Sequence, residues 1–388
     1  MRILVWHNTP PGGARRVVEA QVHGLRAAGH HVEFMVPPNG VAASGRAGLG
    51  PNVLSSPFPE EPTWGMKDSI VSAIRGHAPY CKKVAIHADE VAQHARFIHA
   101  DLVLSHPSIH YRYLPAPFGS DRVPSVTYVH EPNRLVTEHQ YPVGPWRPFS
   151  RVLAETILRT EAEAVGSHDL VLVNSFHTQG ALLAAYGLRS TVAHPGIDSD
   201  FFTPIDSSRE DFALAIGPVH ETKGCRLAVD AVGHVPWNIR PRLVWVAHFV
   251  DERLRRDIVE QAMKLGVRLE IRTGVSDPDL RHLFRTASLV LAVPWLEPLG
   301  LTVLEAQACG TAVVGLAEAG LRETVRHGET GLLANRRDPA DLGRLISDVL
   351  TDPSIAASLG RSGRAWIETY WTADHAASRL AACLESVV

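Results

Sequence analysis

Short apolar runs alternate with amphipathic segments along most of the chain, a pattern typical of parallel strands joined by helices. The first residues already show the repeating unit. An apolar strand is predicted over 2–7, a helix over 14–28 and a second strand over 31–36. Gly12 and Gly13 lie in the turn after the first strand, where the chain must bend sharply. We therefore expect an α/β fold built on parallel sheets.

The same alternation continues along the rest of the chain. Further strands are predicted at eight apolar runs: 102–105, 125–129, 170–174, 212–216, 243–247, 268–272, 287–293 and 312–316. A chain of 388 residues exceeds the usual size of one hydrophobic core, so we expect two domains. Residues 37–65 are rich in Gly, Pro and Ser and predict a long loop, whereas 68–100 predict one or two helices. A helical stretch is also predicted over 339–367.

Composition and charge narrow the class of protein. Hydrophobic residues make up 45% and charged residues 20% of the chain, which is ordinary for a soluble globular protein. The net charge of -3 gives no electrostatic reason to expect a nucleic-acid partner. The four cysteines form no CxxC or zinc-type spacing, and no apolar run is long enough to cross a bilayer. Since the first residues predict a strand and not a signal peptide, we expect a cytoplasmic protein.

One strand–helix unit carries the clearest chemistry. After the strand over 287–293, a helix is predicted over 299–309, and ligands of parallel sheets bind where such a helix begins. The N–H groups of Leu299, Gly300 and Leu301 would be unpaired there and would attract a phosphate. Gly300 would also let a ligand approach the backbone closely.

Two carboxylates, Glu297 and Glu305, flank this helix start. A carboxylate beside a phosphate site is suited to accept hydrogen bonds from hydroxyl groups, as on a sugar and a ribose. The alternative is that both are solvated residues near a helix start, where negative charge is favourable.

The spacing Glu297-x7-Glu305, within EPLGLTVLEAQACGTAVV, closely resembles the nucleotide-sugar signature of GT-B glycosyltransferases, specifically the retaining family 4. The resemblance implies that Glu297 binds sugar hydroxyls and Glu305 the ribose. It also implies two Rossmann-like domains that face each other across a cleft. The first, 1–204, would bind the acceptor and the second, 205–371, the nucleotide sugar, with a last helix, 372–388, packing back on the first.

Two loops extend the resemblance. The run from Gly12 to Arg16, GGARR, resembles the family's GGxER loop, whose glycines lie against the donor phosphates. The run GPVHETKG ends in Lys223-Gly224 and resembles GRxxxxKG, so Lys223 would clamp the donor diphosphate. Arg15 replaces the family's glutamate and Pro218 its arginine. We hypothesise that Arg15 or Arg16 supplies the missing charge; the alternative is that Arg15 is a solvated residue of the first helical turn.

His130 follows the predicted strand 125–129, at the end of the strand where functional residues gather. A lone histidine there is more often structural, but the resemblance implies that it reaches the donor sugar. His106 is a candidate of the same type. We therefore predict three catalytic residues: His130, Lys223 and Glu297.

The motif Asp198-Ser199-Asp200 could form a metal site, because an Asp-x-Asp pair can bind a divalent ion. The motif follows Pro-Gly in a loop at the position of the family's interdomain linker. We therefore expect neither a metal nor a cofactor, with the nucleotide diphosphate sugar as substrate.

The resemblance implies a retaining, metal-independent hexosyltransferase, for which we expect a soluble acceptor, either a small molecule or a saccharide. Lys82 and Lys83 stand among acidic residues, which gives only weak support for membrane association. Two alternatives stay open, a sugar-nucleotide-binding protein without efficient transfer and an epimerase on the same fold. Pro218 and Arg15 favour the first of these. A phosphorylase with lysine-bound pyridoxal phosphate would need a lysine that the sequence does not suggest. The acceptor, the sugar and the nucleotide cannot be read from the sequence.

Overall fold

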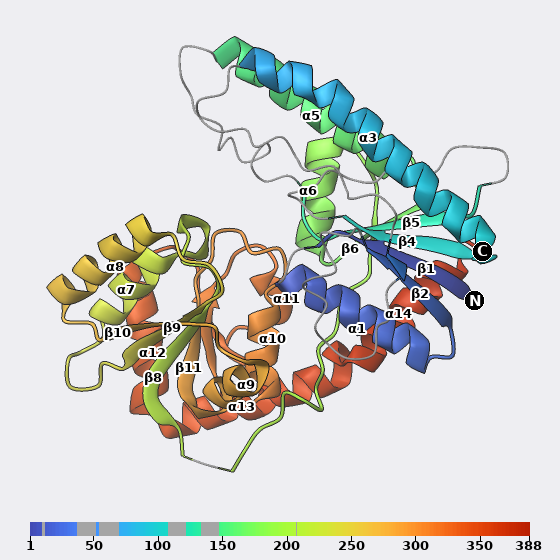
Figure 1. Ribbon diagram of the computed structural model, residues 1–388. Coiled ribbons are helices and arrows are strands. Elements are labelled where there is room, and N and C mark those ends of the chain that lie inside the picture. The colour runs from blue at the N-terminus through green and yellow to red at the C-terminus, as the bar shows by residue number, and fades with distance from the viewer. Residues whose placement is uncertain (10–11, 37–51, 54–69, 108–121, 133–146, 207) are drawn as a thin grey trace. The chain divides into compact units, whose positions relative to one another are not determined.

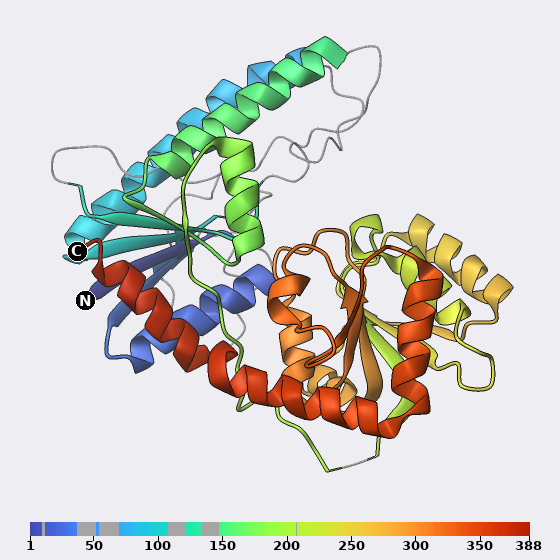
Figure 2. The ribbon, with the colours of Figure 1, turned by 180° about the vertical axis from the view of Figure 1, so that it is seen from behind.

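The computed structural model describes residues 1–9, 12–36, 52–53, 70–107, 122–132, 147–206 and 208–388. They form two compact units, Met1–Gly196 with Asp374–Val388 and Ile197–Ala373. In each unit helices cover both faces of a parallel sheet (Figures 1 and 2). Most of the loop expected over 37–65 lies outside the described residues.

The sheet of the first unit has seven parallel strands in the order β3-β2-β1-β4-β5-β6-β7. The strands are β1 (Arg2–His7), β2 (His31–Val36), β3 (Asn52–Val53), β4 (Leu102–His106), β5 (Ser125–Val129), β6 (Leu170–Val173) and β7 (Thr191–Val192). The strand that comes first in the chain lies inside the sheet. The order reverses between β1 and β4, and such a switch point is where ligands bind in open α/β sheets.

In the described part of this unit, the helices that cover the sheet are α1 (Gly13–Ala27), α3 (Ile70–Phe97), α5 (Arg147–Gly166), α6 (Phe176–Tyr186) and α14 (Ala373–Glu385). The one or two helices expected over 68–100 are thus a single long helix, Ile70–Phe97. Val84 and Val91 of α3 pack on Leu4 and Trp6 of β1, because alternate residues of a strand face the same side. In both ribbon views α1 and α14 lie on the opposite face of the sheet (Figures 1 and 2).

The sheet of the second unit has six parallel strands in the order β10-β9-β8-β11-β12-β13. They are β8 (Glu210–Ile216), β9 (Arg242–Ala247), β10 (Leu269–Thr273), β11 (Ala287–Ala292), β12 (Val313–Leu316) and β13 (Leu332–Ala334). Here too the first strand lies inside the sheet, and the order reverses between β8 and β11. The switch point of this sheet therefore lies between the loops that follow these two strands.

The helical segments of the second unit are η1 (Glu221–Lys223), α7 (Cys225–Gly233), α8 (Glu252–Leu265), α9 (Asp277–Thr286), α10 (Leu301–Ala308), α11 (Leu321–Thr324), α12 (Pro339–Thr351), α13 (Pro353–Trp366) and η2 (Ile367–Trp371). Two buried apolar clusters lie on the two faces of the sheet. One packs against α7, α8 and α12, and the other against α9 and α10. Each face of the central strands is therefore buried, as expected for a parallel sheet.

Two helix boundaries differ from the sequence prediction. The helical stretch expected over 339–367 divides at Asp352, whose carboxylate accepts a hydrogen bond from Ser354 N and caps α13, with Pro353 at its first position. The helix expected from Leu299 begins at Leu301, because Gly300 has φ 96° and cannot be helical. Leu299 and Gly300 therefore belong to the loop before α10.

Candidate functional site

The switch point of the second sheet brings together two loops that are far apart in sequence, 217–224 after β8 and 293–300 after β11. The backbone N–H of Trp295 donates to the carbonyl oxygen of Thr222 at 2.7 Å. Lys223 Nζ lies 2.7 Å from Glu297 Oε2, and both side chains are about a quarter exposed or less (27% and 21%). Thus two of the three predicted catalytic residues are in direct contact, and each is partly open to solvent.

Glycines make this close approach possible. Gly224 has φ 72°, and a Cβ added there would lie 2.1 Å from the carbonyl oxygen of Val293, at the end of β11. Gly217 has φ 144°, and an added Cβ would lie 3.3 Å from Cδ of Lys223. The lysine stem therefore lies along Gly217, whose carbonyl oxygen accepts a hydrogen bond from Trp245 Nε1 at 2.8 Å.

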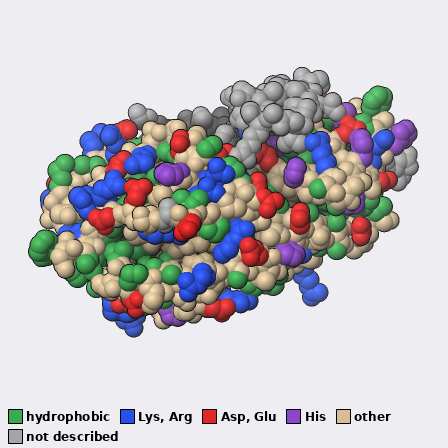
Figure 3. All heavy atoms as spheres, turned by 90° about the horizontal axis from the view of Figure 1, so that it is seen from below, with side chains coloured by type: hydrophobic (Ala, Val, Ile, Leu, Met, Phe, Trp, Pro, Cys, Tyr) green, Lys and Arg blue, Asp and Glu red, His purple; other side chains and the backbone are tan. Residues whose placement is uncertain are grey.

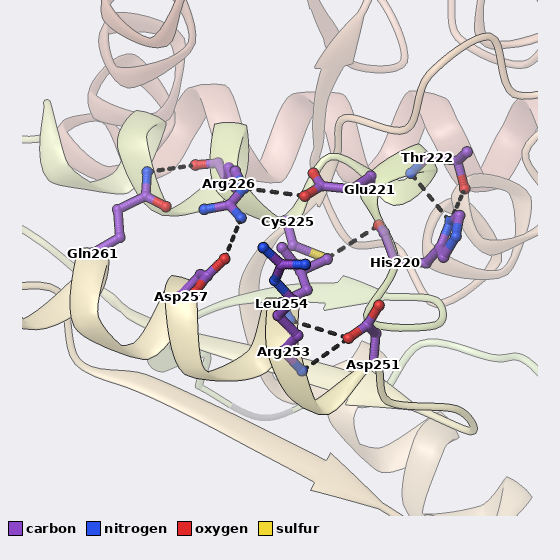
Figure 4. Close-up of polar contacts among 10 residues, drawn as sticks. All are labelled: His220, Glu221, Thr222, Cys225, Arg226, Asp251, Arg253, Leu254, Asp257 and Gln261. Atoms are coloured by element: carbon purple, nitrogen blue, oxygen red, sulfur yellow. Dashed lines mark hydrogen bonds and ion pairs between the residues drawn. The ribbon is translucent and has the colours of Figure 1, made fainter. Parts of the chain in front are cut away.

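Polar contacts hold the lysine loop on the neighbouring helices (Figure 4). The ring Nδ1 of His220 lies 2.9 Å from Thr222 Oγ1. Arg226, in the first turn of α7, contacts Glu221 Oε1 at 3.2 Å and Asp257 Oδ2 of α8 at 2.7 Å. These ion pairs are exposed, so each contributes little stability. Together they link the loop, α7 and α8.

The carboxylate loop is bent, and its backbone is held by a second loop. Leu296 has φ 44°, and Ala319, in the loop after β12, has φ 45°. Positive φ is uncommon for residues with a Cβ, and such strain clusters at functional sites. The N–H of Gly320 donates to the carbonyl oxygen of Glu297 at 2.9 Å. A Cβ on Gly320 would lie 2.2 Å from the carbonyl oxygen of Pro298, so only glycine fits there.

Arg337 also holds this loop, and the sequence reasoning missed it. Its guanidinium donates to the carbonyl oxygens of Pro294 at 3.0 Å and Val293 at 3.1 Å. It contacts Glu318 at 2.9 Å and lies 4.7 Å from the ring centre of Trp295. No local pattern could reveal this role, because Arg337 follows β13 and its partners follow β11 and β12.

Glu305 and Gly300 lie on the helix side of the same site. Glu305 is only 3% exposed, which is uncommon for a glutamate. It is therefore not a solvated residue, and that alternative fails for this position. An added Cβ at Gly300 would meet Leu321 Cδ2 at 2.7 Å. The positive φ of Gly300 and its packing against α11 therefore both favour glycine at this position.

In the first unit, three histidines gather at the carboxyl ends of β1, β4 and β5. His7 and His106 are partners in the register of β1 and β4. His106 Nδ1 lies 3.3 Å from His130 Nε2. Burial lowers the pKa of His130 to about 4 and that of His106 well below its usual range. Burial, with a smaller effect of the Arg15 charge, lowers the pKa of His7 to about 3, so all three rings are neutral near pH 7.

The glycine loop of the first unit leads into α1. Gly12 precedes the helix with φ 148°, and Gly12 and Gly13 are exposed. Arg15 is 5% exposed, and its Nε lies 3.4 Å from Glu19 Oε1. Arg15 is therefore not the solvated residue of the alternative interpretation. Arg16, the next residue, is half-buried.

In the described part of the chain, no group of three His, Cys, Asp or Glu residues is arranged to hold a metal ion. Asp198 has a local role, since its Oδ1 accepts a hydrogen bond from Phe201 N at 2.8 Å. None of the described helices is both long and apolar enough to cross a membrane. On the face shown in Figure 3, cationic and anionic side chains are interspersed, which agrees with the small net charge.

The two Rossmann-like units and the position of the paired side chains at a switch point define the GT-B class of fold. The solved structure of Anabaena Alr3699/HepE in complex with UDP-glucose matches with a TM-score of 0.71, at 19% identity, over 100% of both chains. Models of two family segments also match, "Glycosyltransferase Family 4" over residues 11–201 and "Glycosyl transferases group 1" over residues 198–366. The chain belongs to the group 1 glycosyltransferases of family 4.

Two curated relatives are both named D-inositol 3-phosphate glycosyltransferase. The protein of Streptomyces scabiei is 30% identical over 310 residues, which cover 72% of this chain and 67% of the relative. The protein of Catenulispora acidiphila is 29% identical over 252 residues, which cover 59% of this chain and 60% of the relative. The chain thus matches about half to two thirds of the length of such relatives.

Proposed function

We propose that the chain is a retaining glycosyltransferase that moves a sugar from a nucleotide diphosphate sugar to a small-molecule or saccharide acceptor. The contact between Lys223 and Glu297 at the switch point of the second sheet carries the proposal. A cation and a carboxylate at this position suit the two chemical parts of a sugar nucleotide, its diphosphate and its sugar hydroxyls. The family assignment also supports a sugar nucleotide as the ligand of this site.

Donor binding would replace the ion pair between the two residues. The ammonium group of Lys223 would turn to the diphosphate, where it would offset the negative charge that grows as the sugar bond breaks. The carboxylate of Glu297 would then accept hydrogen bonds from sugar hydroxyls. The first N–H groups of α10 have no acceptor within the helix and would bind the phosphate, with the backbone of Leu299, Gly300 and Leu301. Glu305 would bind the ribose.

The first unit would supply the remaining groups. Gly12 and Gly13 would let the loop lie close to the donor phosphates. His130 would reach the donor sugar. Arg15 and Arg16 are the candidates for the charge that Pro218 does not provide. Arg16 is the less buried of the two and Arg15 already contacts Glu19, so Arg16 is better placed to meet a ligand.

The relatives suggest the first compounds to test. UDP-glucose is bound in a structural neighbour, and D-inositol 3-phosphate stands in the names of curated relatives. We expect a purified sample to transfer sugar from one donor among UDP, GDP and ADP sugars. The first assay would combine UDP-glucose as donor with D-inositol 3-phosphate as acceptor, and a panel of other acceptors would follow. The product should keep the anomeric configuration of the donor, as read from proton NMR couplings. EDTA should leave the rate unchanged.

Each other outcome points to one alternative. Loss of activity in EDTA, restored by manganese, would support Asp198 and Asp200 as metal ligands. An inverted product would contradict the proposed mechanism. Conversion of the donor to a second sugar nucleotide without acceptor would indicate an epimerase. Donor binding without any turnover would indicate a protein that has kept the site and lost efficient transfer.

A further inference from the structure

His106 does not belong to the predicted catalytic set, yet among the described residues it makes the closest polar contact to the ring of His130. The two rings come from neighbouring parallel strands, with centres 5.5 Å apart and His106 Nδ1 3.3 Å from His130 Nε2. Both residues are buried, with exposures of 0% and 8%. This contact occupies Nε2 of His130, and in the described part of the chain Nδ1 is the ring nitrogen left for a substrate.

We propose that His106 is a positioning residue that donates its Nδ1 proton to His130 Nε2. His130 then carries its own proton on Nδ1 and presents a hydrogen-bond donor to the substrate. The consequence for transfer rests on the proposed function, whereas the position of the proton does not.

The direction of the hydrogen bond follows from the other nitrogen of His106. That atom, Nε2, is buried and has no hydrogen-bond partner among the described residues. Buried N–H groups without an acceptor are rarer in proteins than acceptors without a donor. The proton of a neutral His106 is therefore more stable on Nδ1, which has an acceptor, than on Nε2, which has none. A neutral ring has one proton, so Nδ1 of His106 donates and Nε2 of His130 accepts.

The surroundings keep both rings neutral. Burial lowers the pKa values of His106 and His130, and the neighbouring His7 lowers that of His106 further. Thr9 N donates to Nδ1 of His7 at 3.2 Å, so this nitrogen does not compete with His130 Nε2 for the proton of His106. The Tyr128 ring lies 5.1 Å from His106 and 5.2 Å from His130, and its hydroxyl donates to the carbonyl oxygen of Ala193 at 2.7 Å. The tyrosine proton is thus used elsewhere and does not compete for the histidine pair.

Packing alone is the competing explanation, because the His106 ring also fills space beside Tyr128. Two substitutions of nearly equal size separate the explanations. In His106→Asn the amide nitrogen keeps a donor near the position of Nδ1. In His106→Asp the same position holds a carboxyl group, which when ionised accepts only and would draw the proton of His130 to Nε2. If His106 only fills space, the two variants should leave the proton of His130 on the same nitrogen.

The test is the nitrogen-15 NMR spectrum of the histidine rings in the full chain at pH 7.5, with the His130 signals assigned by their loss in His130→Gln. We expect His130 to be protonated on Nδ1 in the wild type and in His106→Asn, and on Nε2 in His106→Asp. A wild-type His130 protonated on Nε2 would overturn the proposal without any need for a folded variant. So would a folded His106→Asp with an ionised carboxyl group whose His130 still carries its proton on Nδ1 alone.

Kinetics give the second measurement. With the acceptor found for the wild type, His106→Asn should keep kcat within about threefold, and His106→Asp should lower it about tenfold, the effect of one lost hydrogen bond. Equal kcat values in the two folded variants would contradict a role in transfer. If the wild type transfers no sugar, the proposed function fails, and the NMR spectrum still decides the position of the proton.

Discussion

Replacing Lys223 with methionine is expected to lower kcat by about 100- to 1000-fold, the usual effect of removing one group that stabilises charge in the transition state. The ammonium group is 2.7 Å from Glu297 and partly open to solvent, so it can exchange this partner for a diphosphate. Methionine keeps the length of the side chain and its packing along Gly217. Steady-state rates with a fixed donor and acceptor would measure the effect.

The matched control is Lys264→Met in the same unit. Lys264 also forms an ion pair at 2.7 Å, with Glu260, but its side chain is 72% exposed and lies on α8. This variant should keep the rate of the wild type. A loss of less than about tenfold in a folded Lys223→Met would mean that the lysine only pairs with Glu297 and does not act on the leaving group.

Gly224→Ala is expected to destabilise the second unit by more than about 4 kcal/mol, a size reached by few single substitutions. An alanine at φ 72° is strained by about 1–2 kcal/mol. The Cβ would in addition lie 2.1 Å from the carbonyl oxygen of Val293, and a backbone atom cannot move aside without displacing β11. Because this contact joins the lysine loop to the end of β11, the displacement should also separate Lys223 from Glu297.

Gly274→Ala separates the clash from the backbone strain. Gly274 has φ 66°, and nothing lies within 4 Å of an added Cβ. This variant should therefore lose only about 1–2 kcal/mol. Urea unfolding, monitored through a spectroscopic signal of the second unit, would give the free energy of unfolding of each variant. Equal losses would show that the loops do not approach as closely as described, and the arrangement of the site would then be in doubt.

The sequence predicted most of the strands correctly, because continuous apolar runs mark strands that are buried on both faces. Helix ends were less accurate where backbone conformation decides them. The stretch 299–309 has a helical composition as a whole, but the positive φ of Gly300 moves the start of α10 to Leu301. In the same way Pro353 and its capping residue divided what the composition alone had suggested as one helical stretch.

The candidate site was only partly visible in the sequence. Resemblance to a family pointed to Lys223 and Glu297 separately, but their contact depends on β8 and β11 being neighbours in the sheet. Gly320 and Arg337 were missed because their partners lie on other loops of the same sheet edge. The pairing of His106 with His130 likewise depends on β4 and β5 being adjacent. Such contacts join residues that are distant in sequence, and local patterns do not encode them.

The central claim is that the loops after β8 and β11, with α10, bind a nucleotide diphosphate sugar. Calorimetric titration with UDP, GDP and ADP, and then with the matching sugar nucleotide, tests it directly in the wild type, Glu305→Gln and Glu297→Gln. Losing a hydrogen bond to a charged group should weaken nucleoside diphosphate binding by about 10- to 100-fold in Glu305→Gln. Glu297→Gln should bind the diphosphate as the wild type does and lose turnover instead. If no nucleotide binds the wild type, or if Glu297→Gln loses the diphosphate while a folded Glu305→Gln keeps it, the account of this site is contradicted.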